Sequence, residues 1–320
     1  MSYTTEVLNI DAAAEVERLA DFVREQVTSM RRSGVIVGLS GGIDSAVMAA
    51  LAVYALGPQK VLGLILPERE SNPVSREYAA KHAMALGIEH HVRDITATVD
   101  AVRPYAERDA YIQSLVPEYV PGSSYNITLP TDLLERDAFS VYMLQVQLSD
   151  GQIKKKRLGM EAFRAITSFA NIKIRARMLH LYAEADRRGL LVGGTTNRTE
   201  YLLGDFCKYG DGGTDIEPLA HLYKNQVYQI ARRLGVIEEI IARMPSPDTF
   251  SLPVSDQEFF FRIPFERLDH LLYAWEHQVP VETTAAVLGL AEDAVKRAFQ
   301  DFTTKHRATA HLRAMPKDLQ

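Results

Sequence analysis

Apolar residues in the first third of the chain follow two patterns, a helical spacing between charged residues and short continuous runs. Residues 12–30 place apolar side chains three and four positions apart, with charges between them, and this spacing predicts an amphipathic helix. Short segments that predict strands, the first two of them buried, alternate with stretches that predict helices. The strands are 34–39, 61–66 and 88–94, and the helices are 46–56 and 75–86, the latter ending at Gly87. This alternation over short connections predicts a parallel sheet with helices on both faces.

The alternation breaks over residues 104–165, which are rich in Pro, Tyr, Asp and Ser. Within this segment, FSVYMLQVQL (139–148) and IKKKRL (153–158) predict two strands joined by a hairpin turn at Asp150-Gly151. We therefore expect an insertion that has a small β element of its own.

The α/β pattern resumes after the insertion. Its expected elements are a helix over 168–188 that ends at Gly189, a strand over 190–192, a helix over 223–234, and helical, aromatic chain from about residue 256. The whole pattern predicts one α/β domain over residues 1–320, with a doubly wound and mostly parallel sheet.

The composition limits the classes of protein and of site. The 320-residue chain has a net charge of −5 at pH 7 and no strongly basic block, so its charge does not suggest a nucleic-acid partner. Cys207 is the single cysteine, which excludes an internal disulfide and a cysteine-rich zinc site. The N-terminus lacks the apolar run of a signal peptide, and no window holds the roughly 18 consecutive apolar residues that span a membrane. We expect a cytoplasmic protein without a membrane partner.

A glycine-rich turn, SGGIDS (residues 40–45), separates the first predicted strand from the next helix. Open α/β sheets bind ligands at the carboxyl ends of their strands. Glycines let backbone N–H groups face an anion, the start of a helix favours phosphate, and Ser40 and Ser45 can donate hydroxyl hydrogen bonds to phosphate oxygens. Asp44 would repel phosphate unless a cation lay between them, so it implies Mg²⁺. The turn lacks the lysine of GxxxxGK[ST] and the spacing of GxGxxG, so neither of those phosphate loops is present here.

This turn resembles the loop of a known superfamily. GLSGGIDSA (38–46) is similar to the SGGxDS loop of the ATP pyrophosphatases, which bind the pyrophosphate of ATP and adenylate a substrate. That group includes NAD synthetase, GMP synthetase, asparagine synthetase and tRNA-thiolating enzymes, and the loop alone does not choose among them.

A second polar cluster, GGTTNRTEYLLGDFCKYGDGGTDIEPLAHLYK, covers residues 193–224. Thr195 and Glu200 come just after a predicted strand, so we expect the Glu200 carboxylate to face Asp44 across the sheet edge and to share a metal with it. The following KYGDGGTD groups Lys208, Asp211 and Asp215 around two glycines, which is typical of a ligand-binding loop.

The second cluster closely resembles NAD synthetase, whose members carry G-T-x-N-x-x-E followed by F-x-K-Y-G-D-G-x-x-D-x-x-P-L. The resemblance covers about 34–94 and 168–250, with weaker agreement at 303–307. It implies an adenine nucleotide alpha hydrolase-like fold, a homodimer, and an ammonia-dependent ligase. In that reaction ATP adenylates the carboxylate of deamido-NAD, pyrophosphate leaves, and ammonia displaces AMP to give NAD.

The resemblance also implies roles for individual residues. ATP would be bound by Gly38, Ser40, Gly41, Gly42, Asp44, Ser45, Thr195, Lys224 and Ser246. The dinucleotide substrate would be bound by Arg175, Lys208, Asp215, Lys305 and His306. Asp44 and Glu200 would hold Mg²⁺, and these two carboxylates together with Lys224 would be the catalytic groups.

The sequence departs from the family pattern on the acceptor side. The 104–165 insertion is long for bacterial ammonia-dependent enzymes and we expect it to lie beside the acceptor end of the cleft. The C-terminal His-Lys pair of the family stands here in reversed order, as Lys305-His306. No glutaminase module is present in the sequence, so we expect ammonia to arrive free or from a separate glutaminase.

Three alternatives remain open at this stage. The first is an amidating ligase of the same fold that acts on another carboxylate, such as a sugar acid or a specialised metabolite. The second is a tRNA-modifying enzyme, which the acidic charge and the missing cysteine pair disfavour. The third is a nucleotide-binding module without catalysis, which Asp44 and Glu200 disfavour.

Overall fold

The larger sheet of the computed structural model, which describes residues 3–136, 141–247, 249–316 and 318, has four parallel strands in the order β3-β2-β1-β7. These strands are β1 (Gly34–Gly38), β2 (Val61–Ile65), β3 (Glu89–Val92) and β7 (Leu190–Gly193). In β1, Val35 pairs with Val61 on one side and with Leu191 on the other. The chain leaves β1 toward β2 and returns later on the opposite side, so the carboxyl ends of β1 and β7 flank a topological switch point.

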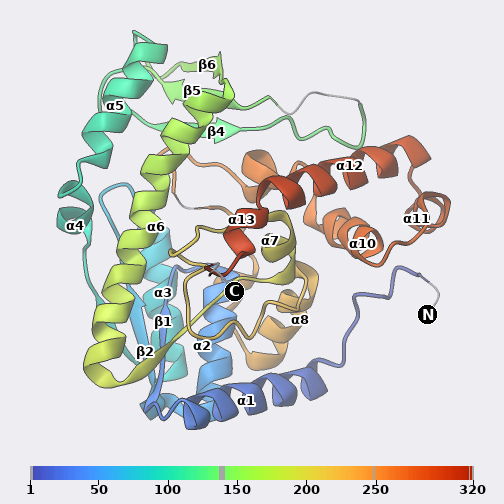
Figure 1. The fold of residues 1–320 in the computed structure, drawn as a ribbon. Coiled ribbons are helices and arrows are strands. Elements are labelled where there is room, and N and C mark those ends of the chain that lie inside the picture. Colours follow the sequence, from blue (N-terminus) through green and yellow to red (C-terminus); the bar gives the residue numbers. More distant parts are fainter. Residues whose placement is uncertain (1–2, 137–140, 248, 317, 319–320) are drawn as a thin grey trace.

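Helices cover both faces of this sheet (Figure 1). Alternate residues of β1 reach opposite faces, so that Val35 and Val37 join one core cluster and Ile36 joins another. The first cluster is covered by α1 (Ala12–Ser29), α2 (Ile43–Leu56), α3 (Pro73–Leu86) and α8 (Lys224–Leu234), and the second by α6 (Met160–Arg188). The predicted doubly wound parallel sheet is confirmed.

The helices on either side of β2 begin earlier than their apolar patterns predict. α2 begins at Ile43 rather than at 46, because Gly42 takes the extended conformation of an N-cap. α3 begins at Pro73 rather than at 75, because the Asn72 side chain caps the helix and proline fits the first helical position. Both starts are set by caps, which apolar periodicity does not reveal.

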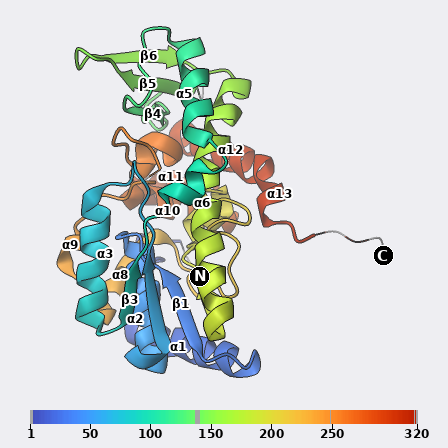
Figure 2. The same ribbon diagram turned by 90° about the vertical axis from the view of Figure 1, so that its left-hand side faces the viewer.

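A smaller antiparallel sheet lies at the opposite end of the molecule (Figure 2). Its strands, in the order β4-β5-β6, are β4 (Tyr125–Thr128), β5 (Met143–Gln147) and β6 (Ile153–Arg157). The predicted hairpin is confirmed as β5 and β6, although residues 139–140 of the predicted first strand lie outside the described residues. β4 is not predicted. Its Tyr125 donates its N–H to Ser251 and accepts the N–H of Leu252, so partners far along the chain hold it.

Two helices that the sequence analysis does not predict lie between β3 and β4. α4 (Thr96–Asp100) and α5 (Pro104–Leu115) precede the small sheet. α5 begins at Pro104, which stands in the first turn of the helix, where a missing N–H costs no helical hydrogen bond.

α6 begins at Met160, well before the predicted start at 168. Ala162 and Ile166 in its first turns pack into the core of the small sheet, so the extra turns are stabilised by tertiary contacts. The helix therefore runs from the small sheet to the large one, and both views show it along the length of the molecule (Figures 1 and 2).

The C-terminal part is helical, as predicted. It contains α10 (Phe265–Glu276), α11 (Val281–Leu288), α12 (Glu292–Ala308) and α13 (Ala310–Arg313). Leu271, Leu272 and Phe302 are fully buried in a core cluster that these helices share with α7 (Arg198–Leu203). Within the described part of the chain, no helix combines the length and the apolar character needed to cross a membrane.

Candidate active site

The switch point opens into a cavity of about 680 Å³. It lies at the carboxyl ends of β1 and β7, where open α/β sheets bind ligands. Most of the predicted site residues line it: Gly38, Ser40, Gly42, Asp44, Ser45, Arg175, Thr195, Glu200, Lys208, Lys224, Ser246 and Lys305. Gly41, Asp215 and His306 are not among the lining residues.

The glycine turn is shaped by close backbone approach. Gly41 has a φ of 77°, and a Cβ there would lie 2.3 Å from the carbonyl oxygen of Ser75. Arg243 donates to the Gly41 carbonyl oxygen at 3.2 Å and to Ser75 Oγ at 2.8 Å, which ties this turn to α3. Only glycine fits this position, so Gly41 supports the turn from behind while its neighbours face the cavity.

Two serine hydroxyls hold the inner side of the turn. Ser40 Oγ and Ser45 Oγ are 3.0 Å apart, and Ser45 Oγ donates to the Gly42 carbonyl oxygen at 3.0 Å. The Gly42 N–H donates to Ser40 Oγ at 3.2 Å. Because α2 begins here, the first N–H groups of the helix have no acceptor within the helix and point toward the cavity end of α2. The turn and the helix start together form a site suited to an anion.

Three charged side chains, of which Lys224 is buried, meet beside this turn. Lys224 Nζ lies 2.5 Å from Asp44 Oδ2 and 3.4 Å from Glu200 Oε1. Asn197 donates from its side-chain amide to Asp44 Oδ1 at 3.0 Å. The structure thus brings together the three predicted catalytic groups from the starts of α2, α7 and α8.

A capping box places Glu200. The Asn197 side chain accepts the Glu200 N–H at 3.1 Å, and Glu200 Oε2 accepts the Asn197 N–H at 3.2 Å. One carboxylate oxygen of Glu200 is therefore fixed by α7 and the other faces Lys224. Asn197 is fully buried and was not singled out from the sequence, although an Asn three residues before a Glu is the signal of such a cap.

The charges of this group shift one another. Burial and the nearby Asp44 carboxylate raise the pKa of Glu200 well above its ordinary value, and Lys224 opposes this shift. Burial disfavours the charged form of Lys224, but Asp44 and Glu200 outweigh it and raise the pKa of this lysine. Because two carboxylates surround one ammonium, the electrostatics of the group favour a further positive charge.

Other carboxyl groups of the cavity were not predicted as site residues. Burial, followed by the charges of Asp256 and Asp211, raises the pKa of Asp205 to about 8. Burial also raises the pKa of Asp256 to about 6. Asp205 lies within the GDFCKYGD stretch, but nothing in its spacing signals that it faces the cavity. The cavity wall is therefore acidic and partly protonated near neutral pH.

The acceptor-side residues are held mostly by backbone carbonyls. Arg175 Nε donates to the Lys208 carbonyl oxygen at 3.2 Å, and Lys208 Nζ donates to the carbonyl oxygens of His311 and Ala314 at 2.9 and 2.7 Å. Lys305 Nζ donates to the Phe260 carbonyl oxygen at 2.7 Å, and burial lowers the pKa of this lysine. These three cations line the cavity beside α13.

Asp215 and His306 have structural partners outside the cavity lining. Asp215 accepts the Val192 N–H at 2.7 Å and the Tyr182 hydroxyl at 3.0 Å, so it joins β7 to α6. His306 Nδ1 lies 2.7 Å from the Leu202 carbonyl oxygen.

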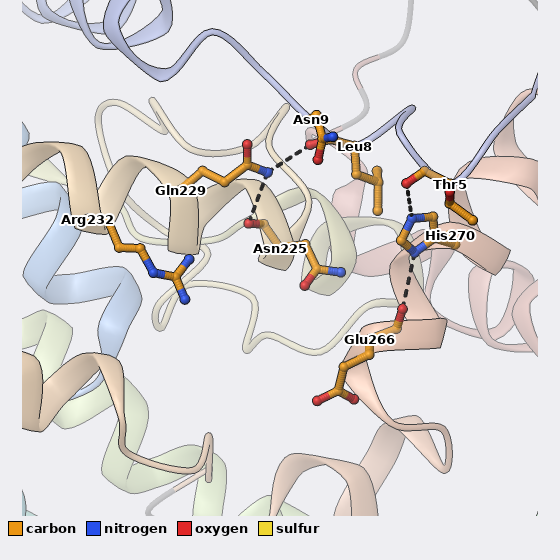
Figure 3. Close-up of a pocket in the computed structure, with 8 residues that line it drawn as sticks. All are labelled: Thr5, Leu8, Asn9, Asn225, Gln229, Arg232, Glu266 and His270. Atoms are coloured by element: carbon orange, nitrogen blue, oxygen red, sulfur yellow. Dashed lines mark hydrogen bonds between the residues drawn. The ribbon is translucent and has the colours of Figure 1, made fainter.

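A second pocket, of about 430 Å³, lies between the N-terminal segment, α8 and α10 (Figure 3). Gln229 donates to the Leu8 carbonyl oxygen at 2.8 Å and accepts the Ile10 N–H at 3.1 Å, and His270 lies 3.0 Å from the Thr5 carbonyl oxygen. Figure 3 shows Gln229 and His270 reaching the N-terminal segment. None of the predicted site residues lines this pocket, and its polar groups serve to hold the segment in place.

The chain is similar to one family over most of its length. The family model described as NAD synthase matches residues 15–117 and 137–316, and leaves out 118–136, which include β4. An NH(3)-dependent NAD(+) synthetase from Mesorhizobium japonicum is 42% identical over 311 residues, which are 97% of each chain.

Two solved structures share the fold. An NMN synthetase from Francisella tularensis has a TM-score of 0.67 at 23% identity, covering 97% of this chain and 99% of that one. An NH3-dependent NAD synthetase from Campylobacter jejuni has a TM-score of 0.62 at 24% identity, covering 97% and 100%.

The raised pKa of Asp205 predicts a pH-dependent stability. The folded chain keeps this carboxyl protonated up to about pH 8, whereas the unfolded chain releases the proton near pH 4. Ionising the buried group therefore costs stability as the pH rises from 6 to 8, by up to about 1.4 kcal/mol per pH unit. Asp205→Asn should lose less stability over this range than the wild-type chain in urea unfolding without nucleotide.

Asp293→Asn is the matched control, because the Asp293 side chain is 81% exposed. Its pH dependence should equal that of the wild-type chain. An Asp205→Asn variant that follows the wild-type curve between pH 6 and 8 would contradict the assignment.

Proposed function

We propose, from the premise that the chain belongs to the NAD synthase family, that it amidates deamido-NAD: ATP activates the substrate carboxylate, and ammonia then displaces AMP to give NAD. The observation that carries this proposal is the meeting of Asp44, Glu200 and Lys224 beside the glycine turn, in the cavity at the switch point. An ammonium and two carboxylates next to an anion-binding turn suit a reaction in which pyrophosphate leaves.

In this proposal the glycine turn holds the phosphates of ATP. The hydroxyls of Ser40 and Ser45 would turn to donate hydrogen bonds to phosphate oxygens, as would the backbone around Gly38 and Gly42 and the start of α2, all of which line the cavity. Thr195 and Ser246 line the same cavity and complete the nucleotide site. Gly41 contributes by allowing the turn to approach α3.

Asp44 and Glu200 are the residues that would hold Mg²⁺. Their carboxylates both face the Lys224 ammonium, and the Asp44 carboxylate, after burial, raises the pKa of Glu200, a repulsion that a cation bound between the two carboxylates would relieve. Among the described residues no cluster of three or more His, Cys, Asp or Glu side chains has the arrangement of a metal site. This fits Mg²⁺, which commonly uses one or two carboxylates together with phosphate oxygens and water. When bound, Mg²⁺ would neutralise charge on the phosphates.

The chemistry needs no protein nucleophile. A carboxylate oxygen of deamido-NAD bonds to the α-phosphorus of ATP, and the bond to the pyrophosphate oxygen breaks. Ammonia then bonds to the acyl carbon, AMP leaves with the electrons of the C–O bond, and the nitrogen loses a proton to give the amide. Lys224 and the N–H groups at the start of α2 stabilise the charge that develops on the phosphates. Burial raises the pKa of Cys207 to about 11, so this cysteine stays a thiol.

The acceptor would lie against α6 and the C-terminal helices. Arg175, Lys208 and Lys305 line that side of the cavity and offer positive charge to an anionic dinucleotide. Asp215 and His306 would contribute indirectly, by holding β7 and α7 in position.

We take residues 1–320 as one ATP pyrophosphatase-type domain, with the insertion at about 104–165 forming part of the acceptor wall. This is supported by Tyr142, Met160 and Phe163, which come from the insertion and line the cavity. Tyr142 and Phe163 stack with ring centroids 3.7 Å apart.

A homodimer through the outer face of α6 is also part of the proposal. Leu179 on this face is 61% exposed, and Tyr209, in the loop that Arg175 contacts, is 62% exposed. An exposed leucine on α6 and an exposed tyrosine in the loop that α6 contacts fit an interface between two copies.

The purified chain is expected to form NAD and pyrophosphate from deamido-NAD, ATP, Mg²⁺ and ammonium. The rate should rise with pH as more of the ammonium becomes free amine. Glutamine should give little product unless a separate glutaminase is added, because Cys207 is buried and protonated. Normal ATP binding without NAD formation, together with turnover of another carboxylate such as a sugar acid, would favour the alternative ligase.

Asp44→Asn is expected to reduce pyrophosphate release by at least about 100-fold, because it removes a charge from the phosphate and metal site. The fold should persist, because the amide still faces Lys224 and Asn197. Asp21→Asn, at an aspartate 76% exposed on α1, is the control and should keep full activity. Equal rates for both variants would refute the role of Asp44.

Light scattering at micromolar concentration should report twice the 35.8 kDa mass of the chain. Leu179→Asp should shift the protein toward monomer, because a charge in an apolar interface is costly to bury. Met84→Asp, at a methionine 64% exposed on α3, should leave the dimer intact. A wild-type monomer with full activity would reject the dimer.

A further inference from the structure

A buried network of charges lies between α5, α6 and the segment 66–72, outside the predicted catalytic group. Lys173 on α6 is 2% exposed, and its Nζ lies 2.5 Å from Glu70 Oε2 and 3.1 Å from Glu68 Oε1. Arg108 on α5, equally buried, reaches Glu70 at 2.8 Å and Asp109 at 2.7 Å. Charges are rarely buried to this extent without a partner or a function.

The network holds a wall of the cavity. Glu68 and Glu70 belong to the segment 66–72, of which Leu66, Pro67, Ser71 and Asn72 line the cavity. The same face of α6 carries Arg177, one turn after Lys173. Arg177 donates to the Leu66 carbonyl oxygen at 3.1 Å and to Ser71 Oγ at 3.3 Å. Two side chains of α6 thus hold this segment. Lys173 pairs with the carboxylates of the segment, and Arg177 hydrogen-bonds to its Leu66 carbonyl oxygen and its Ser71 hydroxyl.

Lys173 also reaches the opposite wall. Its Nζ donates to the Thr249 carbonyl oxygen at 3.4 Å, and Thr249 and Phe250 line the cavity. Phe250 packs edge-on against Tyr125 of β4, with ring centroids 5.7 Å apart. One ammonium therefore touches two cavity-lining segments that lie far apart in the sequence.

These segments border the nucleotide end of the cavity. Segment 66–72 leads directly into α3, whose Ser75 contacts the glycine turn at Gly41. Arg243, which immediately precedes the lining residues 244–247, donates to both Gly41 and Ser75. A shift of either wall would therefore displace the glycine turn, where the ATP phosphates are proposed to bind.

We propose that Lys173 is a positioning residue for ATP: its buried ammonium holds segment 66–72 and Thr249 against α6, so that the nucleotide end of the cavity is formed before ATP arrives. Removing the ammonium leaves Glu68 and Glu70 with Arg108 as the remaining cation of the network, and hydration of the unpaired carboxylate would draw segment 66–72 outward. ATP affinity would then fall with the fraction of chains whose walls are in place. This inference rests on the proposed function, since it takes ATP as the ligand.

The test is ATP binding by calorimetry, without acceptor, together with steady-state kinetics on the full chain. Lys173→Met should weaken ATP binding by about tenfold or more and raise the KM for ATP to match, with kcat changed less than about threefold. Lys173→Arg keeps the charge and should bind ATP within about threefold of the wild-type chain. Glu70→Gln, a milder change, should weaken ATP binding in the same direction and serves if Lys173→Met does not fold.

Asp109→Asn is the matched control. Asp109 is a buried charge of the same network, but it contacts Arg108, Tyr119 and Gly122 rather than a cavity wall. This variant should lower the melting temperature and leave ATP binding within about threefold of wild type. Wild-type ATP affinity in Lys173→Met, or in Glu70→Gln where Lys173→Met does not fold, would overturn the inference, as would an equal loss in Asp109→Asn. A wild-type chain that does not bind ATP would overturn the proposed function and this inference with it.

Discussion

The contact of Lys224 with Asp44 and Glu200 is the constraint around which the site is arranged. Each of the three groups stands at the start of a helix: α2 follows β1, α7 follows β7, and α8 follows the loop after α7. A helix start favours the two carboxylates and disfavours the lysine. The buried lysine in the first turn of α8 is therefore stabilised by its two carboxylate partners and not by the helix. Such a conflict between the local helix preference and the tertiary contacts is typical of a functional site. The partners meet because the chain reverses its direction of winding between β1 and β7.

α6 connects the parts of the molecule that must stay in register with this site. Its first turns pack on the small sheet, its middle carries Lys173, Arg175 and Arg177, and its last turns cover the large sheet. Because α6 is one continuous helix, a movement of the insertion would also move the α6 residues that line the cavity. The buried charge of Lys173 and the hydrogen bonds of Arg177 give the contact a defined geometry, which an apolar contact of the same area would leave freer to slide.

Apolar periodicity revealed the large sheet because its elements are buried against one another in a regular way. The continuous apolar run of β1 reflects burial on both faces of the sheet, and the period near 3.6 in α1 reflects burial on one face of the helix, so both patterns are visible in the residues themselves. The small sheet was revealed only in part. The β5–β6 hairpin carries its own turn signal, whereas β4 and the first turns of α6 depend on partners elsewhere in the chain, such as Ser251 and the core around Ile166.

The site shows the same division. The glycine turn and the two carboxylates were found from the sequence, because phosphate chemistry demands particular residue types at particular spacings, whereas Lys224 was implied by the resemblance to NAD synthetase. The sequence could not show that Asn197 joins Asp44 to Glu200, that Asp205 faces the cavity, or that Asp215 supports β7 instead of lining the site. Those facts depend on which side chains meet after folding and on how far water is excluded from them. The sequence by itself determined which groups are the candidates for the chemistry; the tertiary structure alone decided their partners, because distance and burial arise only when separate elements pack together.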